Sequence, residues 1–204
     1  MIAIALIRPA VPLILRNSGA NGFQIGLVAA LFMAFRAISA SFNGYMWDRN
    51  KIPSFIIPLS FFLMSLLFYG YYFFATFAGF LLIRALQGAL SGTFWPILQL
   101  ETLKRSGKDS SKALSLYYIF GNIGGVVGIL LSAPMILLLT RISKSPSEND
   151  ALPLLFIIGG SIILFLALTS FKLKVNGNEQ EIEEEEEDRI SDNFPRYIFV
   201  FILN

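Results

Sequence analysis

Between two long apolar segments lies a short charged turn, Gly44-Tyr45-Met46-Trp47-Asp48-Arg49-Asn50-Lys51. Residues 17–47 hold no acid or base except Arg36, and residues 52–83 hold none at all. Charge is costly in the hydrocarbon of a bilayer, and a backbone there must satisfy its hydrogen bonds within helices. We therefore expect a tight hairpin loop at a membrane surface, between two membrane-spanning helices.

The composition of the whole chain is that of an integral membrane protein. Of its 204 residues, 55% are hydrophobic and 15% are charged, whereas soluble domains carry about a quarter of charged residues. The chain has no cysteine and no histidine, which excludes disulfides, thiol nucleophiles, imidazole bases and the common zinc sites. We expect no enzyme activity, no metal, no cofactor and no nucleic-acid partner.

Six apolar segments predict an all-α bundle of six transmembrane helices, over residues 1–15, 21–45, 52–75, 77–103, 113–140 and 151–171. The first is short for a span, and a signal peptide is the less favoured alternative because Arg8 lies within its apolar part. Glycines three or four residues apart let helices approach closely. The glycines expected at such contacts are Gly22, Gly26, Gly88, Gly92, Gly121, Gly124, Gly125 and Gly128.

The lysines and arginines between the segments predict an orientation. Eight of them follow the second, fourth and sixth segments: Arg49, Lys51, Lys104, Arg105, Lys108, Lys112, Lys172 and Lys174. Only Arg16, Arg141 and Lys144 follow the other three segments. Because cytoplasmic loops carry the excess of bases, we expect a multi-pass protein of the cell membrane with its N-terminus and its C-terminal linker in the cytoplasm.

The C-terminal part differs in kind from the rest. Residues 1–174 carry a net charge of +9, whereas residues 175–204 carry −7. Dense like charges repel one another, so we expect residues 175–195 to be an acidic, solvated cytoplasmic linker, with metal binding or partner docking less favoured. Residues 196–204 look like the start of an incomplete seventh helix.

Three motifs carry a resemblance to a known family. The turn Gly44-x-x-x-Asp48-Arg49-x-Lys51 resembles the signature loop of the major facilitator superfamily of secondary transporters. The segments Arg84-x-x-Gln87-Gly88 and Lys112-Ala113-Leu114-Ser115-Leu116-Tyr117 resemble two further patterns of that family, in the expected order. Residues 1–174 thus resemble the N-terminal six-helix half of such a transporter, with the chain ending early in the seventh helix.

The resemblance implies a mechanism and partners. Family members have two six-helix halves that rock about a site near the middle of the bilayer, so the expected partners are the lipid bilayer, a small-molecule substrate and a second six-helix half. The signature loop, Gly44, Asp48, Arg49 and Lys51, is expected to act as a gate, in which Arg49 pairs with Glu101 or with the missing half. A surface pair of about 0–1 kcal/mol suits a gate that must open in each cycle.

Three arginines lie within the apolar segments and are candidates for substrate binding: Arg8, Arg36 and Arg84. Because guanidinium groups form bidentate pairs with carboxylates and phosphates, they favour an anionic substrate. We favour Arg84 with Gln87, which fall in a family motif, and add Asn122 as a further contact. The alternative is that the arginines bind backbone carbonyls or polar side chains such as Asn43, or that Arg36 reaches the membrane surface.

Other classes of function stay open at this point. The chain could be an inactive fragment, or one subunit of a split transporter encoded as two halves. It could also be a self-contained homodimeric channel of six-helix subunits. A membrane enzyme is disfavoured, because the apolar segments offer neither a nucleophile with a base nor a pair of carboxylates at their centres.

Overall fold

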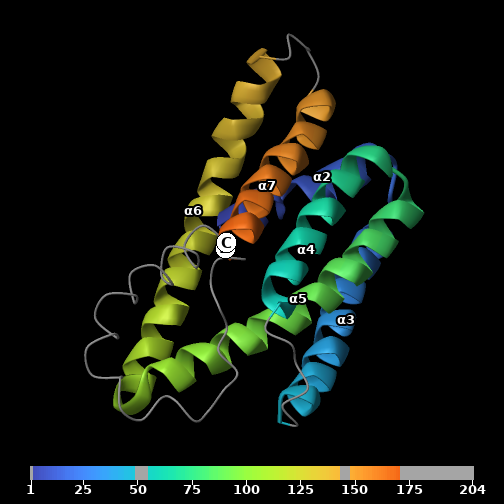
Figure 1. The fold of residues 1–204 in the computed structure, drawn as a ribbon. Coiled ribbons are helices and arrows are strands. Elements are labelled where there is room, and N and C mark those ends of the chain that lie inside the picture. Colours follow the sequence, from blue (N-terminus) through green and yellow to red (C-terminus); the bar gives the residue numbers. More distant parts are fainter. Residues whose placement is uncertain (1, 49–54, 143–147, 171–204) are drawn as a thin grey trace.

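The computed structural model describes residues 2–48, 55–142 and 148–170, and these ranges contain helices and short connections but no strand (Figure 1). The elements are α1 (Ile2–Ile7), α2 (Ala10–Asn17), α3 (Gly22–Asp48), α4 (Ile56–Phe73), α5 (Phe77–Arg105), the 3-10 turn η1 (Gly107–Asp109), α6 (Ser110–Ile142) and α7 (Glu148–Ser170). By length and composition, α3 to α7 can each cross a membrane. The expected all-helical membrane bundle is confirmed.

The first expected helix is broken into two pieces. α1 ends at Ile7 and α2 begins at Ala10, with Arg8 and Pro9 between them. Proline has no N–H to donate, and its ring clashes with the carbonyl four residues earlier, here that of Ala5. The Arg8 side chain is exposed at this break. Each piece is too short to span a bilayer, whereas a single helix was expected over residues 1–15.

The helices pair in an interleaved order. The most extensive contacts join α3 with α5, α4 with α7 and α1 with α6, so no helix has its sequence neighbour as its main partner. In Figure 1, α6 and α7 lie side by side, and α5 runs from the end of α4 to the beginning of α6. α4 also contacts α5 and ties the pairs into one bundle.

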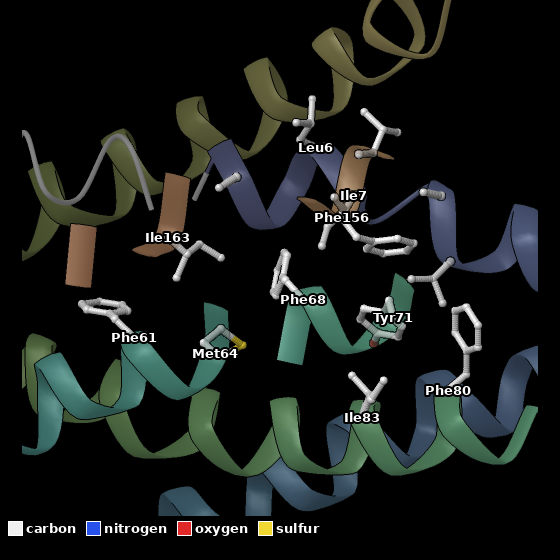
Figure 2. Close-up of a cluster of buried hydrophobic side chains, with 14 of the residues drawn as sticks. Leu6, Ile7, Phe61, Met64, Phe68, Tyr71, Phe80, Ile83, Phe156 and Ile163 are labelled. Atoms are coloured by element: carbon white, nitrogen blue, oxygen red, sulfur yellow. The ribbon is translucent and has the colours of Figure 1, made fainter. Parts of the chain in front are cut away.

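The apolar core lies around α4. Figure 2 shows side chains of α1, α4, α5 and α7 meeting there, among them Phe61, Phe68 and Tyr71 of α4. The ring of Tyr71 stacks on Phe156 of α7 with the centroids 4.6 Å apart, and lies 5.0 Å from the ring of Phe80 of α5. Among the five long helices, α4 and α7 are the most buried and α3 is the least. The bundle therefore has a closed, aromatic side and an open side at α3.

Two glycines of α5 let its backbone touch that of α3. A Cβ placed on Gly88 would collide with the carbonyl oxygen of Phe32, and one placed on Gly92 would lie 2.9 Å from the backbone nitrogen of Ala40. Both contacts are with backbone atoms, which cannot move aside as a flexible side chain can. Any larger residue at these positions must push the two helices apart.

Polar side chains add hydrogen bonds across the same contact. Ser39 of α3 donates to the carbonyl of Ala89 over 2.7 Å and lies 3.1 Å from the Thr93 hydroxyl, both on α5. The amide of Asn43 donates across the contact to the Thr93 hydroxyl over 3.1 Å, and within α3 to the Ser39 carbonyl over 2.7 Å. Together with the glycines, this cluster makes α3 and α5 a tightly joined pair.

The linker expected over residues 175–195 and the helix start expected over residues 196–204 lie outside the described residues. The division of the chain at residue 174 stays a prediction.

Candidate functional site

Three arginines from separate elements form an arginine cluster on the side of α3 and α5. Arg8 lies at the break between α1 and α2, Arg36 lies midway along α3, and Arg84 lies in the third turn of α5. The positive charges of Arg84 and Arg36 both act on Arg8. No Asp or Glu occurs in residues 22–46, 56–73, 110–141 or 152–170. The cluster therefore concentrates positive charge in apolar surroundings without a carboxylate from these segments.

Aromatic rings hold the guanidinium of Arg84. Its Cζ atom lies 5.7 Å from the centroid of the Phe32 ring on α3 and 5.9 Å from that of Tyr71 on α4. Both distances are within the range of a cation–π interaction, which is worth about 0.5–1 kcal/mol at exposed sites and about 2 kcal/mol when desolvated. The two rings therefore stabilise the positive charge of Arg84 from two helices.

Gln87 follows Arg84 by three residues, so the two side chains emerge from the same face of α5. The hydroxyl of Tyr71 donates a hydrogen bond of 2.9 Å to the Gln87 Oε1 atom. The Gln87 residue is only 3% exposed, and its Nε2 atom finds no acceptor among the described residues. Leaving a buried polar group unpaired costs about 1–3 kcal/mol, so this amide nitrogen is a candidate donor for a ligand.

A second set of polar groups lies where α5 meets α6. The Gln99 amide of α5 donates to the hydroxyl of Tyr118 of α6 over 3.2 Å. The neighbouring Tyr117 packs edge-on against the Trp95 ring with the centroids 6.1 Å apart. Arg36 acts electrostatically on the Tyr117 hydroxyl, so these groups lie at the α3 end of the arginine cluster.

The residues expected at the site are thus brought together in part. The charges of Arg36 and Arg84 both act on Arg8, and Gln87 lies beside Arg84. Asn122 is exposed on α6, one turn beyond Tyr118. Four contacting residues were not anticipated from the sequence: Phe32, Tyr71, Gln99 and Tyr118. The three aromatic residues lie in apolar segments that contain many other Phe and Tyr residues. The sequence alone does not distinguish an aromatic ring that contacts a charge from one that packs in the core.

The signature loop is described only at its beginning. Gly44 lies in the last turns of α3 with no atom close to where a Cβ would stand, and Asp48 is the last residue of that helix. Glu101 is half-buried near the end of α5. Arg49 and Lys51 lie outside the described residues. The pairing of Arg49 with Glu101 stays a prediction.

The glycines expected at helix contacts fall into two groups. Gly88 and Gly92 touch α3, Gly128 of α6 touches Ile2 of α1, and Gly121 and Gly124 are buried. A Cβ on Gly22, Gly26 or Gly125 would meet nothing within 4 Å in this chain. Any close contact at these three glycines would have to involve another partner.

Within the described ranges, no group of three or more acidic residues, histidines or cysteines is placed to hold a metal ion. A family model described as Major Facilitator Superfamily matches residues 1–203 of the chain. No curated protein and no solved structure gives a significant match.

Proposed function

The chain belongs to the Major Facilitator Superfamily, and from this premise we propose that it moves a small anionic solute across the cell membrane by alternating access. The family is one of secondary transporters and is generally not enzymatic, and the apolar helices make this chain a multi-pass membrane protein. The anionic solute, the alternating-access mechanism and the orientation in the membrane are our proposals beyond the family assignment.

The arginine cluster is the observation that supports an anionic substrate. Three like charges from α3, α5 and the α1–α2 break are held together in apolar surroundings, where an unneutralised charge is expensive. A cluster of this kind favours a state in which an anion is bound. Arginine suits this role because its planar guanidinium presents paired donors to a carboxylate or a phosphate.

Arg84 and Gln87 are the proposed first contacts of the anion. The rings of Phe32 and Tyr71 fix the Arg84 guanidinium, so less side-chain freedom is lost when a ligand binds. The Gln87 Nε2 atom, unpaired among the described residues, can donate to the same ligand or to a water that bridges to it. Arg8 adds charge from the other side of the cluster.

Alternating access requires a second bundle against the open side of the first. We propose that a second six-helix half, in the same polypeptide or in a separate one, covers the side where α3 is exposed and the arginine cluster lies. Two bundles rocking about this cluster would expose it to one side of the membrane and then to the other. The signature loop at Gly44, Asp48, Arg49 and Lys51 would then hold the cytoplasmic side closed, with Glu101 as a partner.

Uptake into proteoliposomes tests the proposal. The full chain, co-purified with any partner that it retains, should accumulate at least one of labelled acetate, phosphate and gluconate over labelled mannitol. Arg84→Gln should lower this uptake at least tenfold, while Arg84→Lys keeps part of it because the charge remains. Leu82→Met, two residues away on an exposed position of α5, keeps an apolar side chain of similar volume, is the matched control and should leave uptake unchanged. Equal uptake by the wild-type protein and Arg84→Gln would contradict the proposed anion site.

A further inference from the structure

A row of polar residues runs along one face of α6. Ser111, Ser115, Tyr118 and Asn122 follow one another at spacings of four, three and four residues, which places them on the same side of a helix. All four are exposed. We call this row the polar face of α6.

The polar face of α6 contrasts with the apolar exposed residues of the same helix. Leu130 and Leu137 are 69% and 61% exposed, which suits contact with lipid tails. An amide or a hydroxyl in the same position would lose its hydrogen bonds to water, at a cost of several kcal/mol against hydrocarbon. The side chain of Asn122 lies twelve residues into a helix that is long enough to span the membrane. The polar face therefore points to water or to a ligand rather than to lipid.

Two contacts connect the polar face to the neighbouring elements. The 3.2 Å hydrogen bond from Gln99 to Tyr118 adds an amide of α5 to the row. The effect of Arg36 on Tyr117, which adjoins Tyr118 in the chain, brings a positive charge to the same region. A guanidinium, two amides and a phenol thus come from three helices to one region.

This region is separate from the Arg84–Gln87 pair. Gln99 follows Arg84 by fifteen residues on α5, which corresponds to about 22 Å along the helix axis. A small solute cannot touch both ends at once. The charges of both Arg84 and Arg36 act on Arg8.

We propose that Arg36, Gln99, Tyr118 and Asn122 form a second binding station, and that its ligand is an organic acid carrying hydroxyl groups. The acid group pairs with Arg36, and the hydroxyl groups exchange hydrogen bonds with the two amides and the phenol. The inference rests on the proposed function, since the same substrate occupies the Arg84 station at another stage of transport. An inorganic anion such as phosphate can accept hydrogen bonds from the neutral groups, whereas a ligand hydroxyl group can also donate to the two amide oxygens.

The chain has no cysteine, so single cysteines report on the polar face directly. Thiols react as thiolates, which form in water and not in lipid. In the full chain in proteoliposomes, Asn122→Cys should react with a hydrophilic maleimide at least tenfold faster than Leu130→Cys on the same helix. Equal, slow labelling of both would overturn the proposal, because the polar face would then not be accessible to water.

Ligand selectivity tests the chemistry of the station. Intrinsic fluorescence of the purified full chain, titrated with gluconate, acetate and phosphate, should give a tighter affinity for gluconate than for acetate. Tyr118→Phe combined with Asn122→Leu should reduce the gluconate-to-acetate affinity ratio about fivefold to tenfold, the effect expected from losing one or two hydrogen bonds. The double variant should bind acetate as the unmodified chain does.

The outcomes separate the two proposals. If the unmodified chain binds acetate and gluconate equally and the double variant behaves identically, the second station is wrong while the anion site stands. If none of the three anions binds, and Arg84→Gln has no effect on uptake, the proposed function fails and the second station fails with it. Preference for phosphate over both organic acids would also contradict the second station.

Discussion

Tyr71 connects the aromatic core to Arg84 through its ring and to Gln87 through its hydroxyl. Its ring stacks on Phe156, and its hydroxyl donates to Gln87. Tyr71→Phe should therefore leave the ring contacts in place and lower the free energy of unfolding by about 1–3 kcal/mol, because the Gln87 carbonyl oxygen becomes unpaired as well. Thermal or chemical unfolding in detergent micelles measures this loss.

A double variant isolates the cause of that loss. Tyr71→Phe with Gln87→Leu removes both buried partners at once, so it should be close to the unmodified protein in stability, or above it. Its uptake should nevertheless be lost, because the proposed donor is gone. If the double variant is less stable than Tyr71→Phe alone, the loss of stability in Tyr71→Phe does not come from the unpaired Gln87 amide.

Phe32 should matter to ligand affinity more than to the fold. Phe32→Leu keeps an apolar side chain on α3 but removes one of the two rings that hold Arg84. We expect anion affinity to fall about twofold to fivefold, which corresponds to the loss of one partly exposed cation–π contact of about 0.5–1 kcal/mol. Phe35→Leu, on the same helix and 41% exposed, is the control and should not change affinity measured by fluorescence titration.

The sequence identified the charged members of the site and missed the aromatic ones for the same physical reason. A charge within an apolar segment needs an explanation, so Arg8, Arg36 and Arg84 stand out in the sequence. An aromatic residue in such a segment is equally at home in lipid or in a core, and only the contact with Arg84 distinguishes Phe32 and Tyr71 from other rings.

At the scale of the helices, the contact between α3 and α5 should be the least tolerant of added volume. Gly92→Ala places a methyl group against the backbone of α3 and should lower the thermal unfolding midpoint, because the two helices must separate. Gly26→Ala adds the same group where it meets nothing, and should leave the midpoint unchanged or raised. Equal effects of the two changes would mean that the contact does not limit stability.

Hydrogen bonds across the same contact should count for less. Asn43→Leu removes the donor to Thr93 of α5, together with the donor to the Ser39 carbonyl of its own helix. Hydrogen bonds between membrane helices are worth about 0.6 kcal/mol on average and about 1.7 kcal/mol at most, so the loss should stay below that of Gly92→Ala. Unfolding of the two variants under the same conditions compares them, and the reverse order would show that polar contacts dominate.

Helix positions were predictable from apolar segments, but the break in the first helix was not. Pro96, Pro134 and Pro153 all lie inside continuous helices, whereas Pro9 lies at a break. Neighbouring groups decide whether a membrane helix continues through a proline. That choice depends on contacts between helices, which a single segment does not contain.

At the scale of the whole molecule, the direction of the bundle in the membrane can be measured with two cysteines. Asp109→Cys, in the exposed turn between α5 and α6, should react with an impermeant maleimide only from the cytoplasmic side. Ala75→Cys, in the exposed turn between α4 and α5, should react only from the outside. The opposite pattern in intact cells would invert the proposed orientation.

The sequence also could not predict which helices pair with one another. Glycines mark a helix that approaches another closely, but not which one it approaches. Gly88 and Gly128 meet α3 and α1, while Gly22 and Gly26 have the same spacing and meet nothing in this chain. The partner of a packing face is a property of the assembled bundle.

The interleaved pairing has a consequence for biosynthesis. α3 leaves the ribosome before α5, and α4 leaves long before α7, so the first helix of each pair enters the membrane ahead of its main partner. α5 can already cover part of α4, through the contact of Tyr71 with Phe80, but the sides of Phe68 and Tyr71 that pack on α7 remain uncovered until Phe156 and the rest of α7 have been synthesised. A nascent chain that stalls before Leu152 has inserted helices but no closed core, and it is this intermediate that membrane chaperones and proteases would meet.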